Sequence, residues 1–315
     1  MKKAFAVLIC LTLLCFGTCA GRPQTVEIKI LYTDRYEVFT YNGEANIGEI
    51  AGGVSYIYFD DFSIEKVDLT KKISLKKGKV IYNNKSVFGI ICGADNIIYD
   101  AYFEMKEALD ENKKVVLILT DGMSLEQVKH FSEHLTLFGA GYKIAASVNP
   151  AISNVALASI ITGGDPAKTE IYSRITAKPA VPDIFDYALQ KGKAVEYLKT
   201  NSHVITNIEG KASFNDYEVF QKAITAKDEN VDLLFVHFKG IDETNHEYSP
   251  ESPQALEKIL EIEGYVTGLL NGFTGKAIIV SDHGHETVLE NGLEKGNHGL
   301  FVPNDMFVPY FVIDV

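Results

Sequence analysis

Short apolar runs separated by turn residues fill the chain from residue 25 to residue 98. Each run is rich in β-branched or aromatic side chains, which is typical of β-strands. The runs are VEIKILY, YEVFTY, VSYIYF, KVIYNN and VFGIICG. They predict a β-rich N-terminal segment, which we assign to residues 21–98. The pattern leaves open whether this segment forms an edge of the main sheet or a separate module.

From residue 99 onward the pattern changes to alternating strands and helices. Apolar runs predict strands at 115–120, 142–148, 194–198, 231–238 and 277–281. Amphipathic periodicity predicts helices at 99–112, 124–139, 154–163, 183–192, 217–226 and 252–270. Strands that alternate with helices form mostly parallel sheets covered on both faces. The predicted fold class is α/β, with a mostly parallel central sheet and helices on both faces in a catalytic domain at residues 99–315.

The first twenty residues predict a signal peptide, which we assign to residues 1–20. Lys2 and Lys3 precede an apolar run, and small residues follow it, as at a signal peptidase site. We expect cleavage after Ala20 and a secreted or periplasmic protein, with a lipid anchor at Cys19 as the alternative. No later run reaches roughly 18 apolar residues, so we expect no transmembrane segment in the mature chain.

Cysteine content and charge limit the function further. Three of the four cysteines lie in the predicted signal peptide, and Cys92 lies in an apolar run that favours a core position. The formal net charge of −12 disfavours nucleic acid as a partner. The oligomeric state is not predicted by any feature of the sequence.

Carboxylates and histidines follow the predicted strands at the points where those strands end. In chain order they are Asp121, Asp242, His246, Asp282 and His283, and His298 follows further on. The carboxyl ends of parallel strands share one edge of a sheet, where α/β proteins bind ligands. Three carboxylates at one edge would repel one another unless cations lay between them. Aspartate and histidine are suitable ligands for zinc-like ions, so the sequence predicts a metal site there.

Ser153 is predicted to begin a helix after the strand at 142–148. Backbone N–H groups and the positive end of the helix dipole favour an alkoxide or a bound phosphate at such a position. Taken singly, a serine there is more often a simple cap, and an Asp-x-x-x-His pair is more often a solvated loop. Their joint placement after predicted strands favours a catalytic site.

These motifs resemble the alkaline phosphatase superfamily over roughly residues 113–300. They are Thr120-Asp121-Gly122, SNVALASIITG from Ser153, Asp242-x-x-x-His246, Asp282-His283-Gly284-His285 and Asn297-His298-Gly299. The resemblance implies two divalent metal ions, of which zinc is the usual kind. One ion would be bound by Asp121, Ser153, Asp282 and His283. The other would be bound by Asp242, His246 and His298, with His285 orienting Asp242.

The resemblance implies a metal-dependent phosphatase that acts through a phosphoserine on Ser153, and the predicted signal peptide would make it a secreted protein. Our main interpretation is that it hydrolyses small phosphate monoesters. A phosphodiesterase or nucleotide pyrophosphatase of the same superfamily is the alternative, because SNVALASIITG and Asn297-His298-Gly299 resemble that branch. A binding protein that has lost catalysis is a further hypothesis, which no feature of the sequence supports directly. The substrate itself is not predicted.

The chain departs from the alkaline phosphatases proper at two places. Their glutamate five residues before the aspartate of Asp-x-x-x-His binds a third metal, and His237 stands there in this chain. Their phosphate-binding arginine has no counterpart at residues 195–235. Arg174 falls where phosphodiesterase relatives have an asparagine; it is our candidate for binding the phosphate and favours the monoesterase, with a solvent-facing role as the alternative. Weaker candidates are Lys178, Lys199 and Lys211.

A competing motif at residues 130–134 fits the H-x-x-E-H pattern of some metalloproteases. It consists of two histidines, His130 and His134, with Glu133 as the base. The predicted helix around it carries an apolar face that includes Val128 and Phe131. An ordinary solvated helix face is therefore the simpler interpretation.

Overall fold

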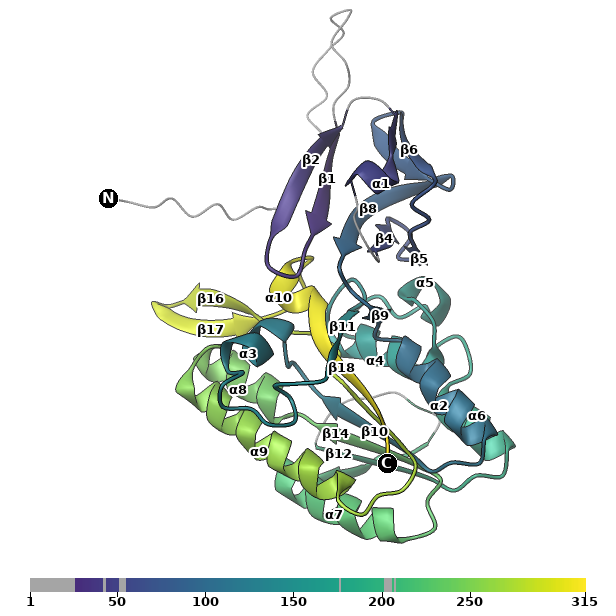
Figure 1. The fold of residues 1–315 in the computed structure, drawn as a ribbon, viewed down its shortest axis with the longest axis vertical. Helices are drawn as coiled ribbons and strands as arrows, with labels where there is room; N and C mark the ends of the chain where they lie inside the picture. The colour runs from purple at the N-terminus through teal and green to yellow at the C-terminus, as the bar shows by residue number, and fades with distance from the viewer. Residues whose placement is uncertain (1–25, 42–43, 51–54, 176, 201–205, 207) are drawn as a thin grey trace, which may run out of the picture.

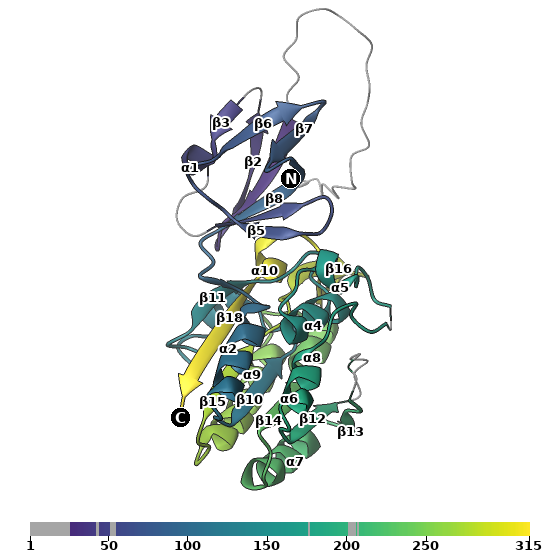
Figure 2. The same cartoon turned by 90° about the vertical axis from the view of Figure 1, so that its right-hand side faces the viewer.

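The computed structural model describes residues 26–41, 44–50, 55–175, 177–200, 206 and 208–315. The predicted signal peptide at residues 1–20 lies outside the described residues. Figures 1 and 2 show two lobes stacked along the long axis, a β-rich N-terminal lobe and a larger α/β lobe. All predicted site residues belong to the α/β lobe.

The N-terminal lobe contains a sheet of order β2-β1-β8-β7-β6-β3, with β4 paired to β8 and β5 to β4. Its elements are β1 (Val26–Leu31), β2 (Tyr36–Tyr41), β3 (Glu44–Asn46), α1 (Ile47–Ile50), β4 (Ser55–Phe59), β5 (Ile64–Lys66), β6 (Lys72–Lys76), β7 (Lys79–Tyr82) and β8 (Lys85–Cys92). The sheet buries an apolar core of its own, in which Cys92 is a buried free thiol as predicted. Strands β1 to β8 therefore form a sheet of their own, and of the described part of the β-rich segment only the short strand β9, at residues 96–97, joins the edge of the catalytic sheet.

The α/β lobe contains a second sheet, of order β13-β12-β14-β10-β15-β18-β11-β9. Its strands are β9 (Asn96–Ile97), β10 (Val115–Thr120), β11 (Lys143–Ala146), β12 (Val195–Thr200), β13 (Lys211–Ser213), β14 (Leu233–Phe238), β15 (Lys276–Val280) and β18 (Phe307–Asp314). A separate hairpin is formed by β16 (Glu286–Glu290) and β17 (Leu293–Asn297). The helices are α2 (Asp100–Asp110), α3 (Leu125–His130), α4 (Ser153–Thr162), α5 (Pro166–Thr169), α6 (Ile184–Gln190), α7 (Asp216–Asp228), α8 (Gly240–Tyr248), α9 (Pro253–Leu270) and α10 (Pro303–Met306).

The second sheet is mixed, so the predicted mostly parallel arrangement is only partly right. Strands β13, β12, β14, β10 and β15 are consecutive neighbours, and each pair is parallel. Strand β18 then lies antiparallel between β15 and β11. The sequence pattern did not predict β18, whose apolar run contains Pro309, a residue that normally argues against an interior strand.

Helices cover both faces of this sheet, as predicted. Along β10, Leu117 and Leu119 face a core shared with α2, α4 and α6. Val116 and Ile118 alternate with them and face a core shared with α7 and α9. Burial of each such side chain stabilises the fold by about 1.5–3 kcal/mol. The central strands are therefore held rigidly from both sides, and so are the residues that follow their ends.

Aromatic side chains connect the two lobes. Phe301 lies edge-on to Tyr58 and to Phe88, with ring centroids 5.2 and 5.3 Å apart. Phe62, on the turn between β4 and β5, contacts the ring of Tyr172 at 5.0 Å between centroids. Tyr172 lies two residues before Arg174, so the N-terminal lobe supports the loop that carries this candidate phosphate-binding side chain.

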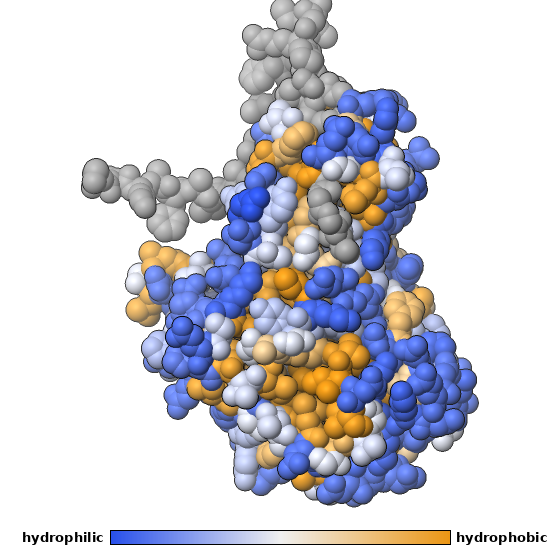
Figure 3. Space-filling view, viewed as in Figure 1, coloured by the Kyte–Doolittle hydropathy of each residue, from blue (hydrophilic) through white to orange (hydrophobic). Residues whose placement is uncertain are grey.

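The surface of the α/β lobe is uneven in polarity. Figure 3 shows apolar residues gathered over the middle of this lobe, with hydrophilic residues on either side of them. Among the described residues, no helix combines the length and the apolar character that crossing a membrane requires.

Candidate metal centre

Three carboxylates leave the second sheet at the carboxyl ends of adjacent parallel strands. Asp121 directly follows β10, Asp282 lies two residues after β15, and Asp242 lies in the first turn of α8, just after β14. The strand order β14-β10-β15 places these three ends side by side. All three carboxylates are buried, with exposed fractions of 0%, 0% and 5%. The fold therefore concentrates negative charge where water is scarce.

Asp242 and His246 lie one turn apart on α8, and Asp242 Oδ1 is 3.3 Å from His246 Nε2. The sequence did not predict this helix, because GIDETNHEY lacks an apolar period. Its first turn is fixed by the buried carboxylate of Asp216. That carboxylate accepts the backbone N–H groups of Lys239 and Gly240 at 3.0 and 2.8 Å. Nothing in the sequence pattern indicated this contact of Asp216.

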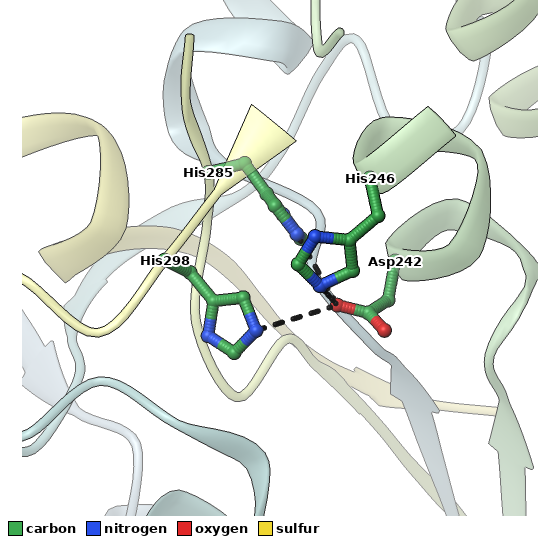
Figure 4. A group of neighbouring side chains, drawn as sticks. All are labelled: Asp242, His246, His285 and His298. Atoms are coloured by element: carbon green, nitrogen blue, oxygen red, sulfur yellow. Dashed lines mark ion pairs between the residues drawn. The ribbon is translucent and has the colours of Figure 1, made fainter. Parts of the chain in front are cut away.

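Four potential ligands form what we call the Asp242 group: Asp242, His246, His285 and His298. Figure 4 shows the three imidazoles directed at one carboxylate oxygen. Asp242 Oδ1 is 3.2 Å from His285 Nε2 and 3.8 Å from His298 Nε2. His285 and His298 lie just before and just after the β16–β17 hairpin, which brings them to the same place.

A second set, the Asp121 group, consists of Asp121, Asp282 and His283. His283 Nε2 is 3.6 Å from Asp121 Oδ1 and 3.4 Å from Asp282 Oδ2. The hydroxyl of Ser153, the first residue of α4, is 3.1 Å from the same nitrogen. The His283 ring also stacks on His298, with centroids 3.8 Å apart. The two groups therefore adjoin, and Ser153 stands beside them.

Backbone carbonyls fix the orientation of the candidate histidine ligands. A carbonyl oxygen can only accept, so the facing Nδ1–H donates and Nε2 keeps its lone pair. For His246, His283 and His298 the acceptors are the carbonyls of Gly296, Gly284 and Ala151, at 3.0, 3.1 and 3.0 Å. Metal-binding histidines are oriented in this way, with the second ring nitrogen held by a neighbouring acceptor.

Several buried polar atoms of the two groups have no hydrogen-bond partner among the described residues. They are Asp121 Oδ1, Asp242 Oδ1, Asp282 Oδ2 and His285 Nε2. A buried acceptor without a partner costs about 1–3 kcal/mol, and more when it is charged. All four face neighbouring potential ligands, and a divalent cation in each group would satisfy them. The residues present thus fit two cations.

The pKa values of the site also reflect its excess of buried carboxylates. Burial raises the pKa of Asp121 well above its usual range, and the nearby Asp282 and Asp242 raise it further. Burial raises the pKa of Asp282 to about 7 and lowers that of His283 to about 3. Burial would also raise the pKa of Asp242, but the close imidazoles of His246 and His285 outweigh it and lower the value. A bound cation would relieve the repulsion between these carboxylates.

The structure brings together all seven predicted metal-ligand positions, and their roles as ligands stay predictions. The structure differs from the resemblance at His285. The resemblance makes this residue a partner that orients Asp242 and does not itself bind the metal. Its Nε2 lies within contact of Asp242 Oδ1, and its Nδ1 is 3.1 Å from the Gly122 carbonyl and 3.3 Å from Asn245 Nδ2. This position suits both orienting Asp242 and binding a cation.

The site is also contacted by Arg174 and His237, the two residues singled out where the chain departs from the alkaline phosphatases proper. Arg174 Nη2 is 3.1 Å from His298 Nε2, so the exposed side chain reaches the edge of the Asp242 group. Asn154 donates to the carbonyl of Ile175 at 3.2 Å and holds this loop beside the start of α4.

His237, at the position of the third-metal glutamate, lies 2.7 Å from Asp121 Oδ2. Among the described residues, the two groups above account for every cluster of three or more potential ligands.

The competing metalloprotease motif is not assembled. Helix α3 ends at His130, so His130 and His134 do not lie one helical turn apart, and both are exposed together with Glu133. The predicted helix over 124–139 is therefore too long. Beyond the end of the helix, the buried carboxylate of Glu263 accepts the backbone N–H of Phe138 at 2.7 Å, a contact across the fold that the local pattern does not show.

Substitution of this motif is expected to leave hydrolysis almost unchanged. His130→Ala and Glu133→Gln alter exposed side chains, and such changes usually shift stability by less than about 0.5 kcal/mol. We expect kcat/KM for phosphate esters to stay within about twofold of the wild type. A tenfold loss in either variant, without loss of folded protein by circular dichroism, would contradict this assignment.

Comparison with known proteins agrees with the geometry. Residues 194–301 match the family model described as type I phosphodiesterase / nucleotide pyrophosphatase. The match includes five of the seven predicted ligand positions: Asp242, His246, Asp282, His283 and His298. This match, over about a third of the chain, supports the predicted resemblance to the alkaline phosphatase superfamily. Within it, the matched family is the phosphodiesterase branch, which favours our alternative over the monoesterase.

Solved structures give only weak matches. Phosphonoacetate hydrolase from Sinorhizobium meliloti, in complex with phosphonoacetate, shares 14% identity with a TM-score of 0.45 over 57% of this chain and 58% of that chain. Murine ectonucleotide pyrophosphatase / phosphodiesterase 5 shares 16% identity with a TM-score of 0.46 over 56% and 58%. The chain thus spans less than two thirds of these proteins, and the values are too low to transfer an activity. No curated protein matches the sequence.

Proposed function

We propose that this protein is a metal-dependent phosphoric ester hydrolase that acts on phosphodiesters or nucleotide pyrophosphates, with phosphate monoesters as the second candidate. One observation carries the proposal: two adjoining ligand groups with unpartnered, buried atoms meet beside a serine at the start of a helix. The matched family supports the diester preference. Secretion stays a proposal that rests on the N-terminal sequence.

In the proposed reaction, the Ser153 oxygen attacks phosphorus and the bond to the leaving oxygen breaks. The phosphoryl group is then carried by Ser153 until water hydrolyses the ester and restores the hydroxyl. Two divalent cations, when bound, would lower the pKa of the attacking hydroxyl and stabilise negative charge on the phosphoryl and leaving oxygens. The start of α4 places its backbone N–H groups and dipole next to the same phosphoryl group.

A panel of substrates tests the proposed function. The purified protein, with its divalent ions, is assayed with bis-nitrophenyl phosphate, nitrophenyl phosphate and a nucleoside triphosphate. We expect the diester or the pyrophosphate to be hydrolysed with the highest kcat/KM. A Ser153→Ala protein purified in parallel measures contaminating phosphatases. Full metal content without hydrolysis of any ester would instead support a binding protein that has lost catalysis.

The Arg174→Ala variant tests the remaining preference between monoesters and diesters. A monoester carries more negative charge on its free oxygens, so it gains more from a guanidinium group. We expect Arg174→Ala to lower kcat/KM for nitrophenyl phosphate by about tenfold or more, and for the matched diester by much less. Arg35→Ala, on the N-terminal lobe, is the control for a general loss of positive charge. Equal losses on both substrates would remove Arg174 from a discriminating role.

A further inference from the structure

His237 is a polar residue in an otherwise apolar strand. It lies in β14, where the neighbours Phe235, Val236 and Phe238 are buried core residues. The residue opposite it on β10 is Leu119, two positions before Asp121. A buried imidazole in the middle of a sheet costs free energy unless it is hydrogen-bonded. Its contact with Asp121 therefore calls for a reason.

That contact is short and isolated from solvent. His237 Nε2 lies 2.7 Å from Asp121 Oδ2, and each side chain is 1% exposed. A carboxylate oxygen accepts, so the imidazole N–H donates. The Asp121 group already contains two carboxylates, and a third carboxylate at position 237 would need additional positive charge nearby. A neutral N–H donor satisfies Oδ2 without any such requirement.

The hydrogen bond leaves Asp121 with one occupied and one unoccupied oxygen. Oδ2 is taken by His237, whereas Oδ1 has no partner and lies 3.6 Å from His283 Nε2. Asp282 shows the same division. Its Oδ1 accepts the backbone N–H of Gly122 at 3.1 Å, and its unpartnered Oδ2 lies 3.4 Å from His283 Nε2. Both unoccupied oxygens thus face the same nitrogen.

We propose that His237 is a positioning residue that holds Asp121 with Oδ1 turned toward His283 and keeps Oδ2 from binding a further ion. Asp121 then serves one cation through one oxygen, and the centre is complete with two ions. This inference rests on the proposed metal-dependent function. It assigns to His237 a role in metal affinity that a residue merely filling the core would not have.

The test measures zinc affinity in a background that isolates the Asp121 group. His246→Ala removes one member of the Asp242 group, and the metal-free full-length chain is titrated with zinc against a competing chelator. His237→Phe is then added, which keeps a ring beside Phe235 but has no donor. His237→Gln is the matched control, because its side-chain amide offers an N–H at a similar reach. Loss of an orienting partner typically weakens metal binding about 10–100-fold.

We expect the phenylalanine variant to bind zinc about 10–100-fold more weakly than the His246→Ala parent, and the glutamine variant to stay within a few-fold of it. Equal affinity of the phenylalanine variant and the parent would overturn the proposal, as would equal weakening in both variants. Thermal unfolding of the metal-free proteins checks that each is folded. If the phenylalanine variant is not, His237→Met, which also lacks a donor, replaces it.

The stoichiometry of the unsubstituted chain gives a second readout. Elemental analysis in excess zinc and magnesium is expected to give about two ions per chain, and a third tightly bound ion would contradict the inference. Neither measurement depends on turnover. A chain that hydrolyses no phosphate ester would refute the proposed function but leave these affinities interpretable, and active protein with unaltered affinities would refute only the role of His237.

Discussion

Ser153→Ala is expected to lower turnover of phosphate esters by at least about three orders of magnitude. The serine oxygen would form the covalent intermediate, and removing a nucleophile that acts with its neighbours as a unit costs a factor of about 10³–10⁶. Ser153 lies 3.1 Å from His283 Nε2 at the edge of the two ligand groups, so no other hydroxyl is expected to replace it. Steady-state kinetics on bis-nitrophenyl phosphate measure the loss.

Two comparisons distinguish this loss from a disrupted site. Ser153→Ala should keep most of its metal content, because Asp121, Asp282 and His283 remain. Ser153→Thr keeps a hydroxyl at the same position and should retain much of the activity. Acid quenching during turnover should yield a phosphorylated peptide that contains residue 153. A phosphopeptide that maps to another residue would refute the assignment.

Removal of divalent ions is expected to abolish hydrolysis and to lower the unfolding temperature. The buried carboxylates lose their partners when the ions leave, whereas a ligand present at 1,000 times its Kd stabilises the native state by about 4 kcal/mol per site. The purified chain should contain about two divalent ions by elemental analysis. Calorimetry before and after chelation measures the shift, and zinc added back should restore both properties.

The Asp242→Asn variant provides the control for chelation. It weakens one ligand group while the Asp121 group remains, so it should contain fewer ions and show a smaller response to chelator. The response to chelator that remains in this variant measures the metal bound by the Asp121 group. A metal-free preparation with full activity would contradict the two-metal proposal outright.

The sequence predicted the elements whose periodicity is strong and whose partners are local. Strands 115–120 and 231–238 and the long helix at 252–270 correspond closely to β10, β14 and α9, because their apolar runs decide their burial. Elements that depend on distant contacts were missed. Glu263, far along the chain, binds the backbone after the end of α3, where the sequence predicted more helix, and Asp216 fixes the first turn of α8. Neither of these two contacts can be recognised from the local sequence pattern.

The proximity of the candidate ligands could be predicted more easily than the order of the strands that carry them. The ligand positions follow strand ends, and parallel strand ends meet at one edge, so residues such as Asp121 and Asp282 could be placed together without knowing the strand order. The contacts of His237, Asn245 and Asp216 could not, since they depend on which strand neighbours which. For His237 there was a signal, a polar residue in a buried strand, but only the pairing of β14 with β10 gives it a partner.

The position of the β16–β17 hairpin also links its local unfolding to metal binding. His285 and His298 bracket it, and the carbonyl of Gly296 in β17 accepts from His246 on α8. In the proposed centre, an ion bound by Asp242, His246 and His298 would join the end of the hairpin at His298 to α8, and the contact of His285 with Asp242 would hold its other end. Fraying of the hairpin would then require the ion to leave. Amide hydrogen exchange in β16 and β17 would slow as the Asp242 group fills, so that the projecting hairpin reports occupancy of a buried centre.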